Sequence, residues 1–551
     1  MPNGRQPAAP YPRWRGWLDA TCLALIVVVY RGLREEIEGL LASGLIEQGF
    51  VGLGLERVTE GFRAEILQHL GVAGAGLLVL GPATRMARHL PRGLLRRASA
   101  ALAWAAGVAL AVPLSLELAV VLRPVALGRP PWHVVLIVID TLRADHLGIY
   151  GYDRGTSPRL DAFARDAFVF ERAISNSSWT RPAVASLLTS QTPFEHGIHR
   201  ESRKHTLAEG IPTLQRVLRD RGFRTAAFLT NAHYKAGLDR DFDELWHGRA
   251  PAGEVYDEVL ARLDELGEER LFLLVHNIDP HDSFVHREGF STRPASSTLR
   301  HTSRLLSARR RGFLFEDPVI TPLGADELGE LRDNYDGEIR YVDHHIGRFL
   351  DALAQRGLAE ETVVVITADH GEEFFDHGSW WHGGTLYREL LHVPLMIRVP
   401  GMGAGRLDEW VAGIDVLPTV AELADARAPP SARGRSLVPL LRGEPLAPRA
   451  ILSATGMRRR GVLASVVVDG HKLIRSPEGE TIGVFDLVRD PAERVNLKDD
   501  VELERRLVAA LSRSRAIAPA ERGRPMELDA SEREALRALG YLVEPEVGAG
   551  P

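Results

Sequence analysis

Cysteine and lysine are both scarce in this sequence. The single cysteine among 551 residues, Cys22, excludes a disulfide within the chain, a zinc site built on several cysteines and a catalytic thiol in the rest of the chain. Only four of the 67 basic residues are lysine, at Lys204, Lys235, Lys472 and Lys498. Most of the positive charge is therefore arginine, and few lysines remain for any active site.

The sequence also lacks a large excess of charge of one sign. The 67 basic and 73 acidic residues leave a formal net charge of −6, so nothing in the overall charge indicates nucleic-acid binding. Hydrophobic residues make up 45% and charged residues 25%, which excludes a disordered or collagen-like chain. The length exceeds that of one ordinary domain, so we expect more than one structural part.

Three long apolar stretches lie near the N-terminus, at 14–30, 66–83 and 100–122. Each approaches the roughly 20 residues that span a bilayer, so we predict a membrane anchor of about three transmembrane helices within residues 1–125. The alternative for the region is a buried helical subdomain, and a cleaved signal peptide is a second alternative for the first stretch.

The charges between these stretches predict an orientation in the membrane. Residues 1–16 contain three arginines and residues 84–100 contain five, with no acidic residue in either segment. The segment 31–64 instead has four arginines against six glutamates. Because positively charged loops stay in the cytoplasm, we expect a multi-pass protein of the cell membrane, with everything after Leu122 on the extracytoplasmic side.

Residues from about 131 to 545 have the pattern of a soluble α/β domain. Short runs rich in β-branched residues alternate with helical patterns; the runs are 134–139, 225–229, 271–278, 363–367 and 394–399, and the helical patterns include 209–221 and 332–356. Continuous apolar strands between helices predict a mostly parallel central sheet with helices on both faces. Ligands of such sheets bind beyond the carboxyl ends of the strands.

Polar residues follow two of these predicted strands. Asp140 comes directly after 134–139, and Asp369 and His370 come just after 363–367. A carboxylate in this position is a candidate ligand or catalytic group, although an aspartate that caps the next helix is the alternative. An adjacent aspartate and histidine offer a hard oxygen and an imidazole nitrogen to a divalent cation. Together they predict a metal site at the strand ends.

A third segment, SNSSWTRPAVASLLTS at 175–190, leads from a polar loop into an apolar helical run. Thr180 is therefore either the N-cap of a helix or a hydroxyl nucleophile. The positive end of a helix is a favourable place for a tetrahedral anion, which supports the second reading.

Several segments also occur in a familiar order. They are IDTLRADHLGIYGY, WTRPAVASLLTS, HNIDPHDSF, YDGEIRYVD, ITADHGEEFFDHG, LHVPLMIRVPG, IDVLPTVAELA and FDLVRDPAERVNL. In this order, over about 133–500, the chain resembles the sulfatase family of the alkaline phosphatase superfamily. The resemblance implies an alkaline-phosphatase-like α/β sandwich, with a catalytic core at 131–400 and a smaller C-terminal part within 401–551.

The resemblance also implies roles for individual residues. Thr180 falls on the nucleophile position, and one divalent cation, which the sequence leaves open among Mn, Zn, Ca and Mg, is the implied cofactor. His382 falls where many sulfatases have an active-site lysine. The family's metal-ligand positions are held by Asp140, Thr180, Asp369 and His370, and its substrate contacts by His281, His382 and Asn231.

The departures from the family pattern bear on the substrate. Usual sulfatases need cysteine or serine in Cys/Ser-x-Pro-x-Arg, which is oxidised to formylglycine, whereas this chain has Thr180 and, in place of the arginine, Val184. In many sulfatases a second aspartate follows the one at the end of the first strand that carries metal ligands, and this position is Thr141 here. An unmodified threonine resembles the nucleophile of the superfamily's phosphodiesterases and of its membrane-anchored phosphoethanolamine and phosphoglycerol transferases.

Three functions are consistent with these features. We favour a membrane-anchored, metal-dependent hydrolase or transferase of phospho-esters, in which a cation activates the threonine hydroxyl and a phospho-threonine passes its group to water or an acceptor. The second is a sulfate-ester hydrolase without formylglycine, and the third is a catalytically weak binding module of the envelope. The expected partners are an ester substrate, on a lipid or an envelope glycan, and the bilayer, but no nucleic acid.

Overall fold

The computed structural model describes residues 133–198, 206–266, 269–293, 323–457 and 461–515, together with 523, 524 and 533. These residues belong to one compact unit, Leu127–Pro551. The three predicted membrane-spanning stretches lie outside the described residues, so the anchor stays a prediction. In the part of the chain that is described, no helix combines the length and the apolar character that crossing a bilayer needs.

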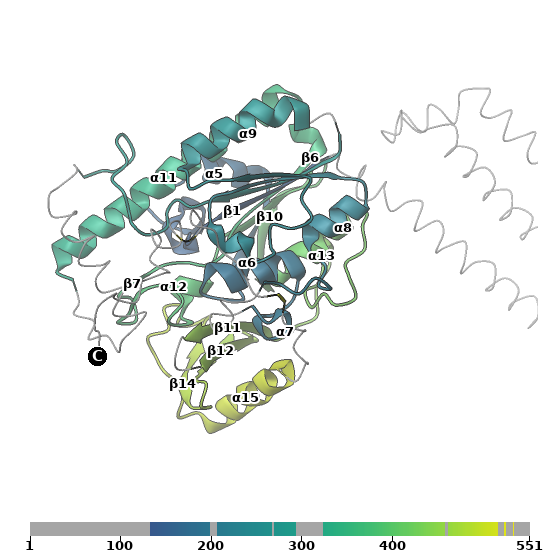
Figure 1. Ribbon diagram of the computed structural model, residues 1–551. Coiled ribbons are helices and arrows are strands. Elements are labelled where there is room, and N and C mark those ends of the chain that lie inside the picture. Colours follow the sequence, from purple (N-terminus) through teal and green to yellow (C-terminus); the bar gives the residue numbers. More distant parts are fainter. Residues whose placement is uncertain are drawn as a thin grey trace, which may run out of the picture. The chain divides into compact units, whose positions relative to one another are not determined.

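The main sheet has eight strands in the order β10-β2-β9-β6-β1-β5-β3-β4 (Figure 1). Only β9 runs antiparallel to its neighbours β2 and β6, so the predicted mostly parallel sheet is confirmed. The strands are β1 His133–Ile139, β2 Phe168–Ile174, β3 Arg224–Leu229, β4 Glu244–His247, β5 Leu271–Asn277, β6 Thr362–Ala368, β9 Leu395–Arg398 and β10 Gly405–Ala412.

Helices cover both faces of this sheet (Figure 1). One layer contains α5 (Pro158–Phe163), α9 (Ala252–Leu266) and the long α11 (Ala325–Gln355), and the opposite layer contains α6 (Thr180–Thr189), α8 (Leu214–Asp220) and α13 (Val416–Leu423). Short helices complete the unit: α7 Pro193–His196, α12 Arg388–Leu391, α14 Val438–Leu441, η1 Ala144–His146, η2 Gly148–Tyr150, η3 Ala164–Asp166, η5 Ala232–Lys235, η6 Ala359–Glu361 and η7 Gly413–Asp415.

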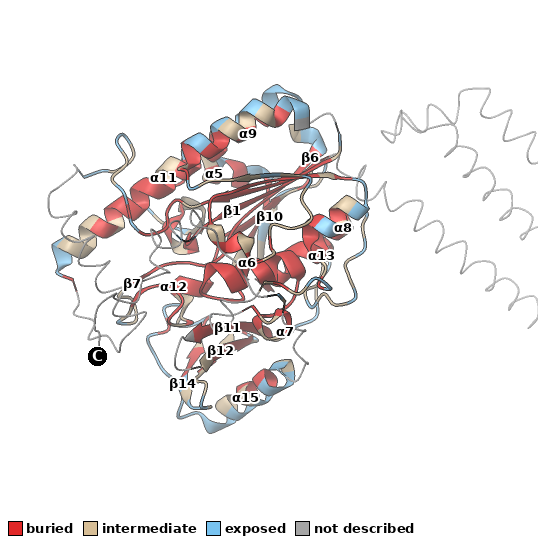
Figure 2. Cartoon of the chain, viewed as in Figure 1, coloured by how far each residue is buried: buried red, intermediate tan, exposed pale blue. Residues whose placement is uncertain are grey.

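The central strands are apolar along their whole length because both of their faces are covered. Every residue of β1, β5 and β6 is buried, and the buried elements form a continuous layer between the helices (Figure 2). Each buried Val, Leu or Ile side chain contributes about 1.5–3 kcal/mol relative to exposure. The three strands are therefore held in the core along their whole length.

A second, smaller sheet forms the C-terminal part of the unit. Its four antiparallel strands are β11 Ile451–Met457, β12 Gly461–Val468, β13 His471–Arg475 and β14 Thr481–Asp486, and α15 (Val501–Arg515) packs against them. A two-stranded hairpin, β7 Glu373–Phe374 with β8 Trp380–Trp381, follows the end of β6. The predicted division into a catalytic core at 131–400 and a C-terminal part within 401–551 stays a prediction.

Two predicted helices differ from the observed ones at their starts. The pattern at 209–221 forms only α8, because Pro212 disfavours a helical conformation in the residue before it, and Thr213 caps the shorter helix by accepting the Arg216 N–H at 3.4 Å. The pattern at 332–356 forms α11, which already begins at Ala325.

Candidate active site

The predicted strand-end residues meet at one edge of the main sheet. In the sheet, Ile139 at the end of β1 pairs with Ala368 at the end of β6 and with Asn277 at the end of β5. Asp140 and Asp369, which follow the first pair, are therefore neighbours. The register of adjacent parallel strands, rather than any proximity in sequence, brings the two carboxylates together.

Asp140, Asp369 and His370 form a buried cluster whose potential ligand atoms all lie within 4.8 Å of one another. The Nε2 atom of His370 lies 3.4 Å from Oδ2 of Asp369 and 3.8 Å from Oδ1 of Asp140. Its Nδ1 atom lies 2.8 Å from the Gly371 carbonyl oxygen, which can only accept a hydrogen bond. Nδ1 therefore donates this hydrogen bond, and Nε2 faces the carboxylates.

This donor set fits a divalent cation. Among the described residues, Oδ2 of Asp369 has no hydrogen-bond partner although it is buried. Burial raises the pKa of Asp369, and burial together with the Asp369 charge raises the pKa of Asp140 well above its usual range. Two carboxylates, an imidazole and a hydroxyl suit Mn²⁺, Zn²⁺, or Ca²⁺ or Mg²⁺ with added water.

Thr180 is the hydroxyl nearest to this cluster. Its Oγ1 lies 3.2 Å from Nε2 of His370 and 3.5 Å from Oδ1 of Asp140, and the residue is fully buried. Thr180 is the first residue of α6, and Trp179 is the N-cap, so the alternative that Thr180 serves as the N-cap does not match the structure. Its hydroxyl lies where the positive end of the helix dipole meets the cluster.

The loop after β1 is held against the cluster by other elements. Thr141 has a φ of 56°, and its backbone N–H donates to Oδ1 of Asp369 at 3.2 Å. The hydroxyl of Tyr335 on α11 donates to the Thr141 carbonyl at 2.7 Å and accepts the N–H of Arg143 at 3.0 Å. Arg143 forms 2.9 Å ion pairs with Asp145 and with Asp376, which lies beyond β6. The loop after β1 and the loop after β6 are thus tied together.

Asn231, predicted as a substrate contact, hydrogen-bonds at both ends of its amide. Its Nδ2 donates to Oδ2 of Asp140 at 2.8 Å, and its Oδ1 accepts the backbone N–H of His233 at 3.0 Å. The side chain is completely buried. Asn231 therefore fixes the orientation of the Asp140 carboxylate, a role that the sequence did not indicate, and the substrate contact stays a prediction.

The two predicted substrate histidines lie beside the cluster. The ring of His382 is 4.7 Å from that of His370 and 4.9 Å from that of His281, measured between centroids. Nδ1 of His382 lies 3.1 and 3.2 Å from the two carboxylate oxygens of the buried Glu372. Nδ1 of His281 lies 2.6 Å from the Asp282 carbonyl oxygen. The structure therefore places both histidines beside the cluster, and their contacts with substrate stay predictions.

One residue near the cluster was missed in the sequence. His276, in β5, is fully buried, and its Nε2 lies 3.6 Å from Oδ2 of Asp140. Burial, with a smaller contribution from His370, lowers the pKa of His276 to about 3, so the ring is neutral. The sequence feature that could have indicated this residue is a histidine within an otherwise apolar predicted strand.

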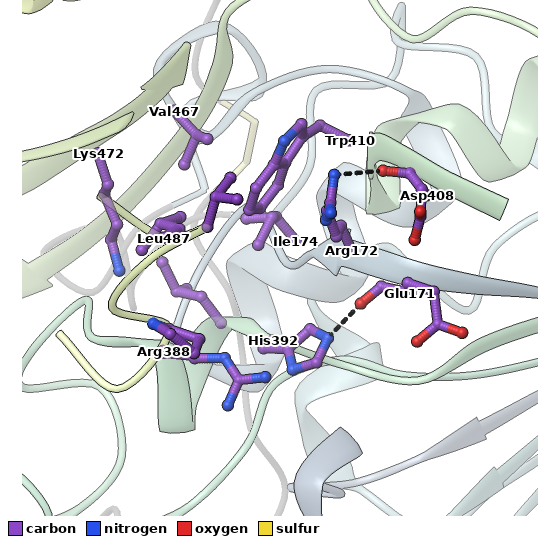
Figure 3. A pocket seen from close by; sticks show the side chains of 13 residues that line it. Glu171, Arg172, Ile174, Arg388, His392, Asp408, Trp410, Val467, Lys472 and Leu487 are labelled. Carbon is purple, nitrogen blue, oxygen red and sulfur yellow. Dashed lines mark hydrogen bonds between the residues drawn. The ribbon is translucent and has the colours of Figure 1, made fainter. Parts of the chain in front are cut away.

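A separate cavity of about 260 Å³ lies between strands β2 and β10 of the main sheet and the C-terminal sheet (Figure 3). Arg388, His392, Trp410 and Lys472 are among its lining residues, and none of the cluster residues is. Nε2 of His392 donates to the Glu171 carbonyl oxygen at 2.8 Å, as Figure 3 shows.

Sequence and structure comparisons agree on the family. The sulfatase family profile matches residues 133–426, more than half of the chain, and a profile described as N-sulphoglucosamine sulphohydrolase, C-terminal, matches residues 376–516. The arylsulfatase of Clostridium perfringens is 25% identical over 442 residues, covering 68% of this chain and 92% of that protein. The choline-sulfatase of Rhizobium meliloti is 23% identical over 442 residues, covering 68% and 83%.

Solved structures share the fold. The phosphonate monoester hydrolase of Agrobacterium radiobacter superposes with a TM-score of 0.59 at 20% identity, over 70% of this chain and 95% of that one. The enzyme of the same kind from Silicibacter pomeroyi gives 0.57 at 23% identity, over 69% and 94%. With its strand-end carboxylates, the nearby helix-start hydroxyl and these matches, the chain belongs to the sulfatase family and is a hydrolase of the alkaline phosphatase-like superfamily.

Proposed function

We propose that this chain is a metal-dependent enzyme that transfers a phosphoryl group from an ester substrate to Thr180 and then to water or an acceptor alcohol. The observation that carries the proposal is the position of the Thr180 hydroxyl, which lies 3.2 Å from Nε2 of His370 and 3.5 Å from Oδ1 of Asp140 at the start of α6. An unmodified hydroxyl in this position is a nucleophile that needs no oxidation to act.

The chain's own residues divide the work as follows. Asp140, Asp369, His370 and Thr180 would hold the cation, which supplies a lowered hydroxyl pKa and positive charge for the transferred group. Asn231 holds the Asp140 carboxylate in place, and the α6 N-terminus directs positive dipole towards the transferred anion. His281 and His382 would contact the substrate oxygens from the neighbouring side of the cluster.

The reaction balances in two steps. In the first, the bond from Thr180 Oγ1 to phosphorus forms, the ester oxygen leaves, and the threonine proton departs with it as the alcohol. In the second, water or an acceptor alcohol attacks the phosphorus, the bond from phosphorus to Thr180 Oγ1 breaks, phosphate or the new phospho-ester leaves, and the proton of the attacking group returns to Oγ1. Two successive displacements at phosphorus, with the threonine oxygen first as nucleophile and then as leaving group, are the usual form of covalent catalysis.

The threonine also favours phosphate over sulfate. The formylglycine of usual sulfatases carries a second hydroxyl when hydrated, and this hydroxyl helps to expel sulfate, whereas a sulfo-threonine has none. Sulfate-ester hydrolysis through Thr180 is nevertheless a second candidate, because the arylsulfatase and choline-sulfatase matches each cover 68% of the chain. Assays on an aryl phosphate, a phosphodiester and an aryl sulfate, with and without added metal, decide between the two.

Thr180→Ala tests the nucleophile directly. We expect turnover of the preferred ester to fall by orders of magnitude, because the attacking oxygen is gone, while stability changes by only about 1 kcal/mol. Thr180→Ser should keep part of the activity. Intact-mass analysis of the enzyme quenched during turnover should show a phosphoryl adduct in the wild type if the intermediate accumulates.

Thr189→Ala is the matched control. Thr189 is an equally buried threonine at the other end of α6, and its hydroxyl donates to the Ala185 carbonyl at 2.6 Å and accepts the Gln191 N–H at 3.3 Å. This variant should turn over the substrate at close to the wild-type rate. A Thr180→Ala enzyme that does the same would remove the covalent mechanism.

The proposal includes attachment to the cell membrane. The three apolar stretches at 14–30, 66–83 and 100–122, with arginine-rich segments before the first and between the second and third, support an anchor that holds the catalytic domain outside the cytoplasm. An ester on a lipid or an envelope glycan would then be within reach of the site.

A further inference from the structure

The cavity between the main sheet and the C-terminal sheet, of about 260 Å³, takes no part in the proposed reaction. Figure 3 shows Val467 and Lys472 of the C-terminal sheet on one side of it and Arg172 and Trp410 of the main sheet on the other. Much of the wall is apolar, and besides Trp410 it includes Ile174, Leu391, Val467, Leu487, Val488 and Pro491. Binding sites for small molecules commonly combine such a wall with a few polar groups.

Two charged side chains of the wall already have a counter-ion. The ammonium group of Lys472 forms a 2.8 Å ion pair with the buried Glu493. The carboxylate of Glu171 forms an ion pair with Arg406, which lies outside the wall. Both pairs are complete without a ligand, so neither residue adds a net charge to the cavity.

The other charged side chains of the wall are Arg172, Arg388 and Asp408. Arg172 donates to the Asp408 main-chain carbonyl at 2.9 Å, and the charges of these two residues formally cancel. The main-chain N–H of Arg388 donates to Oε2 of Glu493 at 2.6 Å, but among the described residues the Arg388 guanidinium has neither a hydrogen bond nor an ion pair. The wall therefore carries one uncompensated positive charge.

Other polar groups near Arg388 do not compensate its charge. Burial, and then the Arg388 charge, lower the pKa of His392 to about 4, so this ring is neutral. Its Nε2 donates to the Glu171 carbonyl at 2.8 Å, and its Nδ1 has no hydrogen-bond partner in the described part of the chain. The charge of Arg388 also reaches Asp145, which already forms a 2.9 Å ion pair with Arg143. An anion in the cavity would be the counter-ion that Arg388 lacks.

We propose that this cavity is a binding site for a small carboxylate with a compact apolar body. The carboxylate pairs with the Arg388 guanidinium, and the apolar body lies against Trp410 and the aliphatic part of the wall. A planar carboxylate matches the fork of guanidinium donors and supplies a single negative charge, whereas a phosphate dianion would leave one charge in excess. Covering the apolar wall adds a hydrophobic contribution. A molecule bound here contacts both sheets and holds them together.

Benzoate, benzamide and acetate test the two parts of this site separately in the full-length protein. Benzoate has both the charge and an apolar ring, benzamide has the ring without the charge, and acetate has the charge without the ring. In ligand-observed NMR titrations, the dissociation constant of benzoate should be lower than that of either other probe by about tenfold or more. Equal affinities for benzoate and benzamide, or no binding of benzoate, would overturn the proposal.

Arg388→Gln removes the charge that the carboxylate needs. Because the guanidinium has no partner to lose among the described residues, this variant should fold like the wild type. It should bind benzoate about tenfold more weakly and benzamide with unchanged affinity. A variant that still binds benzoate as tightly as the wild type would remove Arg388 from the site.

Val488→Asp and Val495→Asp are matched variants. The two valines are 57% and 58% exposed, but Val488 lines the cavity and Val495 does not. An aspartate at position 488 repels the carboxylate and should weaken benzoate binding, whereas one at position 495 should leave it unchanged. Equal benzoate affinities in the two variants would contradict the proposed position of the ligand.

Asp369→Ala separates this cavity from the metal centre. The variant loses a proposed metal ligand but should bind benzoate like the wild type, because the cavity and the Asp140, Asp369 and His370 cluster share no residue. Loss of benzoate binding in this variant would place the benzoate at the metal centre and overturn the cavity site.

Discussion

The two carboxylate oxygens of Asp140 face different neighbours in the candidate site. Oδ1 faces Thr180 and His370, whereas Oδ2 accepts from Asn231 and faces His276. With Asp369 beside it, the site concentrates negative charge in a buried place, so burial and the Asp369 charge raise the pKa of Asp140. A divalent cation removes this cost, so the residues favour metal before any substrate arrives.

Asp369→Ala should therefore lose metal without losing the fold. The substitution removes the carboxylate whose Oδ2 lies 3.4 Å from Nε2 of His370, and we expect metal affinity to fall by about tenfold or more. Metal analysis after dialysis, together with circular dichroism, measures both properties. Full metal occupancy in this variant would remove Asp369 from the ligand set.

Asp343→Ala is the control for that experiment. Asp343, on α11, is a buried carboxylate whose oxygens accept the N–H groups of Arg159 and Leu160 at 3.0 and 2.8 Å. Its loss should cost about 1–3 kcal/mol of stability, because two buried donors lose their acceptor, yet leave the metal content unchanged.

At the scale of elements, α11 matters through one hydroxyl. Tyr335 lies in the middle of this 31-residue helix, and its hydroxyl bonds both the Thr141 carbonyl and the Arg143 N–H. The helix thereby positions the loop that follows β1. The buried face of α11 packs against the core and so holds Tyr335 in place. The two hydrogen bonds of its phenol hydroxyl then hold the loop.

Tyr335→Phe should destabilise the protein by about 1–3 kcal/mol and reduce turnover, because a buried carbonyl and a buried N–H lose their partner. Tyr234→Phe is the comparison: Tyr234 is equally buried, but among the described residues its hydroxyl has no hydrogen-bond partner, so its removal should cost little stability. Chemical or thermal unfolding measures the pair. Equal losses in the two variants would contradict the positioning role.

The β7–β8 hairpin carries a carboxylate with a strongly shifted titration. Burial, and then the nearby Glu389 charge, raise the pKa of Glu373 from 4.5 to about 7. Between these values the folded protein holds a proton that the unfolded chain has released. Stability from this group is therefore complete below about pH 4.5 and is lost as the pH rises through about 7.

Glu373→Gln should flatten that dependence. The amide keeps the acceptor for the N–H groups of His377 and Ser379 and can donate to Thr385, but it cannot ionise. At about 1.4 kcal/mol per pKa unit, the wild type should lose on the order of 3 kcal/mol more than the variant between pH 5 and pH 8. Melting temperatures across this range provide the measurement, and parallel profiles for the two proteins would refute the assignment.

At the scale of the whole molecule, the predicted membrane anchor would decide on which side of a membrane the catalytic unit lies. The arginine-rich segments 1–16 and 84–100 are predicted to be cytoplasmic and the acidic segment 31–64 extracytoplasmic. If three spans are present, as proposed, their odd number would place the unit on the extracytoplasmic side, where an ester on a lipid or glycan would meet the site.

Fusion reporters test this orientation. A C-terminal alkaline phosphatase fusion should be active, because that enzyme matures only outside the cytoplasm, and a C-terminal GFP fusion should be dark. The reverse pattern would overturn the orientation. If the purified chain stays in solution without detergent, the spans themselves are wrong.

The sequence by itself determined the α/β class and three of the proposed metal ligands. The runs that form β1, β5 and β6 are apolar throughout because helices cover both faces of a parallel sheet and exclude water from them. This property is visible in consecutive residues of the sequence. Asp140, Asp369 and His370 stand out because each follows such a run. These are local patterns, so a single sequence is enough to find them.

Only the tertiary structure decided the antiparallel direction of β9, the contact of Asn231 with Asp140, and the approach of His276 to the same carboxylate. Each depends on which strands are neighbours and in which register they pair. In a strand that is buried on both faces, the local sequence pattern does not show to which face a histidine points. The strand order β6-β1-β5-β3 determines which residues become its neighbours. Contacts through space between distant segments arise from packing, which the pattern within one segment does not contain.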